Sequence, residues 1–386
     1  TTINRNLGLD FSLFNTNVTG SLDFYKNTTK DLLLRSAIPS NTGFTTQWAN
    51  VGSTSNQGVE LGINAPVLKG KDLLVNLNFN IGRNIAKIEA LDGTNSRFFQ
   101  SNWASTDLKD RDDYYFEVGG RVGDVYGYVT DGYYQTSDFE SYDATSGRYI
   151  LKEGVANSGG TVGNGNIRPG FLKLKDLNDD GIINSEDRQV IGNTLPKAQG
   201  GFGFDAVYKG FDISIFFDWT YGNDVYNAGK IQYSQFRRVT YGNLLSTMSL
   251  DNRFSYLDVD GSYTGTPGGI VTDLGQLAEM NANKNIWSHG SYGVAQAVIH
   301  SWAIEDGSFI RLNNLNIGYS LPKRWISRIK MSQLRVYAPG NNQKLWTKYS
   351  GYDPEVTTKG NGLTPGVDYS GFPRSRSFTF GLNISF

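Results

Sequence analysis

The feature that most constrains this chain is a repeated two-residue alternation of apolar and polar side chains. The last ten residues show it clearly, with one register formed by Phe378, Phe380, Leu382, Ile384 and Phe386. Successive side chains of a strand point to opposite faces, so this pattern predicts a strand with one apolar and one polar face. The same pattern predicts eight earlier strands, at residues 7–13, 18–25, 59–65, 73–82, 202–208, 211–219, 315–321 and 334–338.

The links between these nine predicted strands alternate in length. Links after the first, third, fifth and seventh strands are short, whereas the other four cover residues 27–56, 87–197, 223–306 and 341–374. A transmembrane antiparallel β-barrel has short turns on one side of the membrane and long extracellular loops on the other. The alternation of apolar and polar side chains, taken alone, fits a soluble β-sandwich equally well. The loop asymmetry and the terminal Phe386 favour an all-β barrel, with apolar side chains facing lipid and Asn, Ser, Asp and Gly lining a wet lumen.

Composition excludes several classes of function. The 386 residues carry a net charge of −1, no cysteine and only two histidines, His289 and His300. This charge gives no basic field for nucleic acid. The lack of cysteine excludes disulfides, thiolate metal sites and cysteine nucleophiles. No apolar run reaches the roughly 20 residues of a membrane helix. Neither histidine has a partner at a diagnostic spacing, and no nucleophile elbow or phosphate loop occurs, so we predict no enzymatic activity.

An odd number of strands is unusual for a complete barrel. Bacterial single-chain barrels have even strand numbers and no free edge. We therefore expect residues 1–386 to be the C-terminal portion of a larger barrel, the rest of which precedes Thr1. Thr1 opens directly into a strand pattern, and no segment resembles a signal peptide.

Several stretches together resemble a known family, the SusC/RagA-type TonB-dependent outer-membrane transporters. The stretches that carry the resemblance are TKDLLL (29–34), NVGSTSNQGVELGI (50–63), GDVYGYVTDGYYQT (123–136), LKLKDLNDDGIINSEDRQVIGNTLPKAQGGFGF (172–204), YKGFDISIFFDWTYGNDVYN (208–227), DGSFIRLNNLNIGYSLP (306–322), KYSGYDPEV (348–356) and GVDYSGFPRSRSFTFGLNISF (366–386). Two features depart from the family. Pro339 lies where such barrels carry an ordinary strand residue, so we expect the eighth strand to end or bulge there. The sequence of residues 223–305 is not shared with the family, so no substrate preference is carried over from the resemblance.

The resemblance implies a 22-stranded barrel in the outer membrane of a Gram-negative bacterium, with this chain supplying strands 14 to 22. It implies a lumen plug, outside this chain, through which the TonB complex supplies energy. It also implies a SusD-like lipoprotein lid over the extracellular mouth, contact with outer-membrane lipids, and import of oligosaccharides or peptides. The family pattern allows a dimer of transporter–lid pairs. No substrate-contacting residue is identified by it.

The sharpest local motif is DLNDDGIINSED, residues 176–187. Asp176, Asn178 and Asp180 occupy loop positions one, three and five, Gly181 position six and Asp187 position twelve. This is the spacing of a calcium loop, with Asp in place of the usual final Glu. We predict a structural Ca²⁺ held by the side chains of Asp176, Asn178, Asp180 and Asp187 and the carbonyl of Ile182, although Mg²⁺ fits the same residue types. The alternative is a solvated acidic turn.

Other motifs allow two interpretations each. LPKRWISRIK (321–330) places Trp325, Ile326 and Ile329 on one helical face among basic residues, which suits either a lipid-touching turn or a helical plug of the barrel's end. Aromatic residues gather in two links, as Tyr126, Tyr128, Tyr133 and Tyr134 and as Trp346, Tyr349 and Tyr352. They suit ligand stacking, a membrane girdle or loop packing.

Two functions from different classes therefore fit the sequence. The first is part of a gated import channel. The second is a secreted, calcium-binding β-rich module for carbohydrate binding or adhesion, although the calcium-loop spacing occurs only once in the chain.

Overall fold

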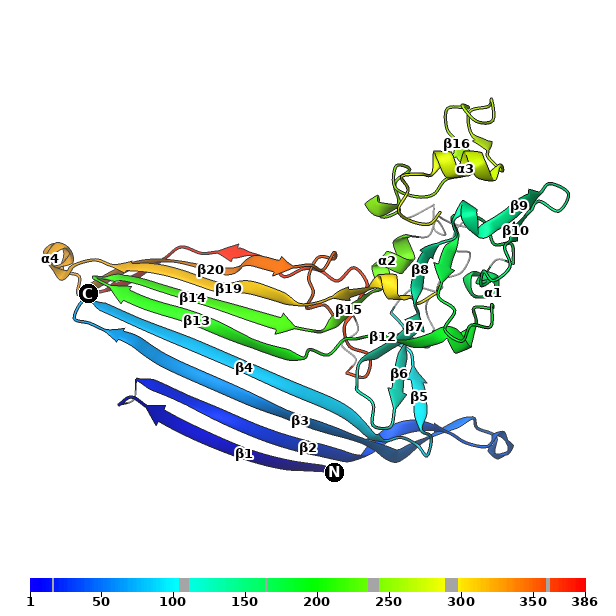
Figure 1. Cartoon of the computed structure of the whole chain (residues 1–386). Helices are drawn as coiled ribbons and strands as arrows, with labels where there is room; N and C mark the ends of the chain where they lie inside the picture. Colours follow the sequence, from blue (N-terminus) through cyan, green and yellow to red (C-terminus); the bar gives the residue numbers. More distant parts are fainter. Residues whose placement is uncertain (16, 104–110, 164, 235–242, 289–297, 359–361) are drawn as a thin grey trace.

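A long antiparallel sheet dominates the fold (Figure 1). The computed structural model describes residues 1–386 except residues 16, 104–110, 164, 235–242, 289–297 and 359–361. Within these residues, one ten-stranded sheet has the order β1-β2-β3-β4-β13-β14-β19-β20-β22, and β23 pairs with β20. Its strands are β1 (Thr2–Leu13), β2 (Val18–Ala37), β3 (Thr46–Lys69), β4 (Leu73–Ala90), β13 (Ala198–Tyr208), β14 (Phe211–Tyr221), β19 (Phe309–Ser320), β20 (Gln333–Thr347), β22 (Ser377–Phe378) and β23 (Gly381–Ser385).

All nine predicted strands are present, and the ninth is divided into β22 and β23. Pro339 explains the division, because proline has no N–H to give the ladder. The Thr379 N–H donates to the Pro339 carbonyl at 2.9 Å, but Pro339 cannot donate in return, and residues 379–380 opposite it leave the ladder. The expectation that β20 itself ends at Pro339 is wrong. β20 continues to Thr347, and Pro339 pairs regularly with Asn316 of β19. The bulge lies further along, between Asn341 and Lys344, where β20 has one residue more than the facing stretch Leu312–Asn314 of β19.

Two of the predicted long links are shorter than expected. The link predicted at residues 27–56 consists mostly of paired strand, because β2 and β3 continue to the pair Ala37 and Thr46. The link predicted at 341–374 likewise begins only after Thr347. Backbone pairing does not require an apolar face, so the strands extend beyond the point where the alternation stops. The two long links at 91–197 and 222–308 remain.

One face of the sheet is apolar and exposed across all its strands. Apolar partners meet in register from strand to strand, as in the pairs Leu7–Phe24, Phe24–Val59, Phe79–Phe202, Ile213–Ile317 and Val336–Leu382. The side chains at the C-terminal end are the most exposed, with Phe380 at 83% and Phe386 at 87%. A water-soluble sheet buries such a face, so this arrangement fits a wall that faces lipid.

The described residues of the segments 91–197, 222–308 and 348–376 lie beyond one end of the sheet and fold into a layer of their own, here called the loop layer. Figure 1 shows it at the end opposite the short turns. Its strands are β5 (Ser96–Phe99), β6 (Tyr114–Glu117), β7 (Asp124–Tyr128), β8 (Thr130–Tyr133), β9 (Phe139–Asp143), β10 (Arg148–Leu151), β11 (Leu172–Leu174), β12 (Arg188–Asn193), β15 (Asp224–Asn227), β16 (Leu257–Asp258), β17 (Gly269–Ile270), β18 (Ile304–Asp306) and β21 (Val367–Asp368). Its helices are α1 (Gly159–Val162), α2 (Ala228–Tyr233) and α3 (Leu274–Met280).

The hydrophobic core of the chain lies in the loop layer. Among the described residues, Ile88 and Phe309 are the only buried apolar side chains of the ten-stranded sheet. Two clusters form the core: one surrounds Phe171, Phe254 and Trp287, and the other surrounds Trp103 and Tyr226. In the described part of the chain, no helix is both long enough and apolar enough to span a membrane. Among the described residues, the sheet therefore has almost no hydrophobic core of its own, whereas the loop layer packs around two cores.

Candidate functional site

The polar face of the sheet carries a hollow of about 540 Å³ that is rich in carboxylates. Asp23, Glu60, Asp218 and Glu355 contribute to its lining, together with amides such as Asn80 and Gln199. Asp23 and Glu60 are direct cross-strand partners on β2 and β3. Like charges at such positions destabilise a sheet. A ligand with many hydrogen-bond donors, or a cation, would relieve this repulsion, so this face is chemically suited to bind polar ligands.

Arg311 on β19 joins the rim of this hollow to the loop layer. Its side chain is only 1% exposed and donates to Asp353 at 2.7 Å and to Asn342 at 2.7 Å. Glu355 lies 2.8 Å from the same guanidinium and also contacts Arg374 at 3.1 Å. Burial is the largest single effect on the pKa of Asp353 and raises it, but the Arg311 hydrogen bond, the Glu355 N–H and the Arg311 charge together leave that pKa below its ordinary value. Arg311 thus fixes the link after β20 to the end of the wall.

Motif reasoning overlooked this ion cluster. Asp353 and Arg311 lie in the stretches KYSGYDPEV and DGSFIRLNNLNIGYSLP, both of which carry the family resemblance. An arginine in an otherwise apolar and amide-rich strand was the available signal. Its partners Asn342 and Asp353 lie 31 and 42 residues along the chain, and only the fold brings them together.

His300 lies in the core of the loop layer. It is 2% exposed, its Nδ1 lies 2.7 Å from the Thr130 hydroxyl, and its ring stacks on Trp302. Burial, assisted by the charge of Lys230, lowers the pKa of His300 to about 3. A neutral, packed imidazole of this kind is structural. His289 lies outside the described residues.

The lowered pKa of His300 predicts acid sensitivity of the loop layer. The ordinary value is 6.5, so between that value and about 3 the unfolded chain binds more protons than the folded one. The stabilisation is complete above pH 6.5 and is lost as pH falls toward 3. We expect a loss of about 2 kcal/mol between about pH 7 and about pH 5. Hydrogen exchange of the loop layer in wild type and His300→Gln measures it. An equal pH dependence in both proteins would contradict the assignment to His300.

The predicted aromatic clusters divide between packing and exposure. Tyr134 is buried and its hydroxyl contacts the carbonyl of Ala156 at 2.5 Å, while buried Tyr349 contacts Asp368 at 2.5 Å. These two are loop-core residues. Trp346 is half exposed on β20, in the ladder opposite Ile310, as expected of a girdle residue. Tyr352 is 73% exposed, and its ring is available for stacking.

The predicted calcium residues lie in one turn that is closed by backbone N–H groups. Asp176 accepts from the N–H groups of Asp179 and Gly181, both at 2.8 Å, and Asp180 accepts from Ile182 at 2.8 Å. Buried Asp187 accepts from Leu177 and Asn184, both at 2.8 Å. Gly181 has a φ of +81°, as the predicted bend requires. Among the described residues, no three His, Cys, Asp or Glu side chains are gathered in a group that could hold a metal.

The basic segment 321–330 forms the turn between β19 and β20. It contains α4 (Lys323–Ile326) and a short 3-10 turn (Ser327–Ile329). The three apolar residues do not share one environment, because Ile326 is buried while Trp325 and Ile329 are more than half exposed. The turn thus plugs the wall's end with one side chain and presents two others outward. Both interpretations of the segment are compatible with this arrangement.

No protein-family model matches the chain, but the chain is similar to several proteins named TonB-dependent receptors. The TonB-dependent receptor P3 of Formosa agariphila is 29% identical over 385 residues, which cover 98% of this chain and 33% of the receptor. The TonB-dependent receptor SusC of Bacteroides thetaiotaomicron is 27% identical over 383 residues, or 99% of this chain and 31% of that protein. This chain spans about a third of the length of these curated relatives.

Solved structures of the RagAB peptide transporter share the fold. One matches 100% of this chain and 35% of its own chain with a TM-score of 0.68 and 20% identity. Another, the RagAB peptide importer in the closed-closed state, gives a TM-score of 0.66 at 21% identity. The ten-stranded sheet is therefore a partial barrel. The names of these relatives are those of receptors and transporters, which agrees with the prediction that the chain is not an enzyme.

Proposed function

The chain is SusC/RagA-like over its whole length, and we propose that it is the C-terminal part of the barrel of a TonB-dependent transporter in the outer membrane of a Gram-negative bacterium. The observation that carries the proposal is the pair of opposite faces on one sheet. The outward face is apolar and exposed on every strand, and the inward face is lined by carboxylates, amides and glycine. A secreted binding module has no use for an exposed apolar wall, so the structure favours transport over the alternative function.

The proposed cargo is an oligosaccharide or a peptide. The hollow on the polar face offers carboxylate and amide groups, which hydrogen-bond hydroxyl and amide groups of either cargo. Exposed Tyr352 adds an aromatic face near the mouth. Energy reaches the barrel from TonB through a plug that is outside this chain. The names of two similar proteins support this proposal: SusC is a TonB-dependent receptor, and RagAB is a peptide transporter.

The loop layer is the proposed seat of a SusD-like lipoprotein lid. The hairpin of β16 and β17 belongs to the part of the loop layer at the top of Figure 1, where β16 is labelled, and exposes Leu257, Val259 and Ile270 by 46%, 65% and 53%. Buried Asp258 holds its turn through the N–H groups of Tyr263 and Thr264. Burial opposes this charge, but these hydrogen bonds, together with one from the Thr264 hydroxyl, lower the pKa of Asp258 to about 2. A rigid turn with exposed apolar groups is suited to an interface. Dimers of transporter–lid pairs remain a prediction.

Co-purification of the whole transporter with its lid tests this assignment. Replacing Leu257, Val259 and Ile270 with Ser removes the exposed apolar groups and spares buried Asp258. We expect the lid to bind about a hundredfold more weakly, as for loss of a central interface patch. Serine at Val118, Ile150 and Val190, which are exposed at 41–43% elsewhere in the loop layer, is the matched control. Full lid retention by the first variant would contradict the assignment.

We further propose that the acidic turn at residues 176–187 binds calcium. Its support is the loop spacing and the positive φ of Gly181. Asp176, Asn178, Asp180 and the carbonyl of Ile182 would supply oxygens. Asp187 already accepts two N–H groups, so it would share its oxygens with them.

Calcium should protect this turn from proteolysis. We expect Asp176→Ala with Asp180→Ala to abolish protection that appears on adding Ca²⁺ and disappears with a chelator. Asp143→Ala is the control, because Asp143 closes another exposed turn through Thr145 and Ser146. If cleavage is the same with calcium, with chelator and in the double variant, the segment is a solvated turn.

A further inference from the structure

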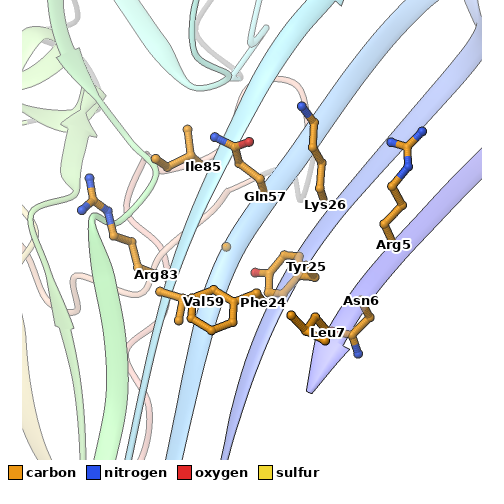
Figure 2. A pocket seen from close by; sticks show the side chains of 11 residues that line it. Arg5, Asn6, Leu7, Phe24, Tyr25, Lys26, Gln57, Val59, Arg83 and Ile85 are labelled. Carbon is orange, nitrogen blue, oxygen red and sulfur yellow. The ribbon is translucent and has the colours of Figure 1, made fainter. Parts of the chain in front are cut away.

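Three long cationic side chains gather on the outward face of β1 to β4. Arg5, Lys26 and Arg83 are exposed and line a hollow of about 600 Å³ (Figure 2). Arg5 and Lys26 are direct cross-strand partners, and Lys26 pairs in turn with Gln57. Arg83 pairs with Val59, two residues from Gln57 on β3. The three cations therefore form one patch across four neighbouring strands, and we call it the basic patch.

The basic patch belongs to the lipid-facing register. Leu7, Phe24 and Val59 lie two residues from Arg5, Lys26 and Gln57 on the same face, and they line the same hollow. The intervening residue Tyr25 turns to the other face, where its hydroxyl donates to Asn84 at 2.9 Å. The patch thus adjoins the apolar surface directly, without a polar belt between them.

The height of the basic patch places it near one border of the membrane. Lys26 lies eight residues from the start of β2 at Val18. This corresponds to about 26 Å along the strand and about 20 Å along the membrane normal at a tilt of about 40°. The apolar band of such barrels is about 25 Å tall, so the long side chains reach the headgroup region on the loop-layer side.

The charges of the basic patch are not balanced within the protein. In the part of the chain that the structure describes, none of the three cationic side chains forms an ion pair. The acidic neighbours Asp23 and Glu60 lie on the lumen register of β2 and β3. Unpaired cations beside lipid carry a free-energy cost unless anionic headgroups neutralise their charge.

We propose that the basic patch binds the phosphate groups of a phosphorylated lipid from the surrounding leaflet. The guanidinium groups of Arg5 and Arg83 suit bidentate contact with phosphate, and Lys26 adds a point charge between them. The acyl chains lie over Leu7, Phe24 and Val59. Gln57 offers an amide to the headgroup. This inference rests on the membrane barrel proposed above, and it gives one sector of the wall a preference for particular lipids.

Lipid retention by the purified whole transporter tests the proposal. Detergent-solubilised protein is incubated with diphosphorylated lipid A or with phosphatidylcholine, and the retained lipid is measured by native mass spectrometry. The test variant carries Arg5→Gln, Lys26→Gln and Arg83→Gln. The control carries Lys69→Gln, Lys71→Gln and Lys209→Gln, which remove the same charge at the opposite end of the sheet.

We expect wild type and control to prefer lipid A over phosphatidylcholine, and the test variant to bind lipid A about a hundredfold more weakly. Equal retention of lipid A by test variant and control overturns the proposal. Displacement of lipid A by millimolar inorganic phosphate also overturns it, because the site would then serve a soluble anion. If the wild type is water-soluble without detergent, the proposed barrel function fails instead, so the two failures are distinguishable.

Discussion

Deleting Phe386, or adding a charged tail after it, will lower the amount of this protein that is inserted in the outer membrane. Phe386 is 87% exposed, so its removal costs the fold of this chain almost no packing. A decrease in inserted protein must therefore arise because Phe386 is recognised during insertion or because it contacts lipid. An apolar contact of this size contributes about 1.5–3 kcal/mol, which corresponds to a reduction of about tenfold or more.

The amount of inserted protein is measured in isolated outer membranes by immunoblotting and heat-modifiability. Phe372→Ala is the control, because Phe372 is 93% exposed but lies outside the strands of the sheet. Normal insertion after both the deletion and the charged tail would show that the terminal aromatic residue has no role in insertion.

Replacing Arg311 with Leu will release the link after β20 from the wall. The substitution leaves the carboxylate of Asp353 buried without its cation, and breaking a buried pair in this way costs about 3–5 kcal/mol. We expect faster hydrogen exchange and easier proteolysis in residues 348–358, with the rest of the sheet unchanged. The exposed ion pair of Glu355 with Arg374 cannot replace the buried contacts of Arg311 with Asp353 and Asn342.

Two companion variants isolate the cause. Arg374→Gln removes only a half-exposed ion pair with Glu355 and should change stability by about 0–1 kcal/mol. Adding Asp353→Leu to Arg311→Leu removes the unpaired buried charge and should restore part of the lost stability. If Arg311→Leu and Arg374→Gln behave alike, the buried cluster does not hold the link.

The strands were predictable because one physical requirement determines their pattern. A wall between lipid and water must alternate, and all nine strand positions show this alternation. The strand ends were not predictable. Above the lipid, β2 and β3 remain paired up to Ala37 and Thr46 without an apolar register, so nothing in the pattern marks the end. Pro339 shows a related limit, since its missing N–H interrupted the neighbouring strand rather than its own.

The loop layer was the least predictable part. Its cores combine residues far apart in sequence, such as Phe139, Phe254 and Trp287, on short strands and irregular segments without a regular period. The aromatic residues were visible in the sequence, but the difference between buried Tyr349 and exposed Tyr352 depends on tertiary contacts. The basic patch was equally hidden, because Arg5, Lys26 and Arg83 come together only through the register of four strands.

Cysteine labelling along β4 tests the central claim most directly. This chain has no cysteine, so single substitutions at Leu77, Asn78, Phe79 and Asn80 give unambiguous sites within it. Any cysteine elsewhere in the whole transporter is first replaced by serine. A water-soluble maleimide is applied to intact outer membranes that contain the inserted protein. We predict labelling at the lumen positions Asn78 and Asn80 and none at Leu77 and Phe79, which face lipid. Labelling of all four positions to the same extent would contradict a membrane-spanning wall.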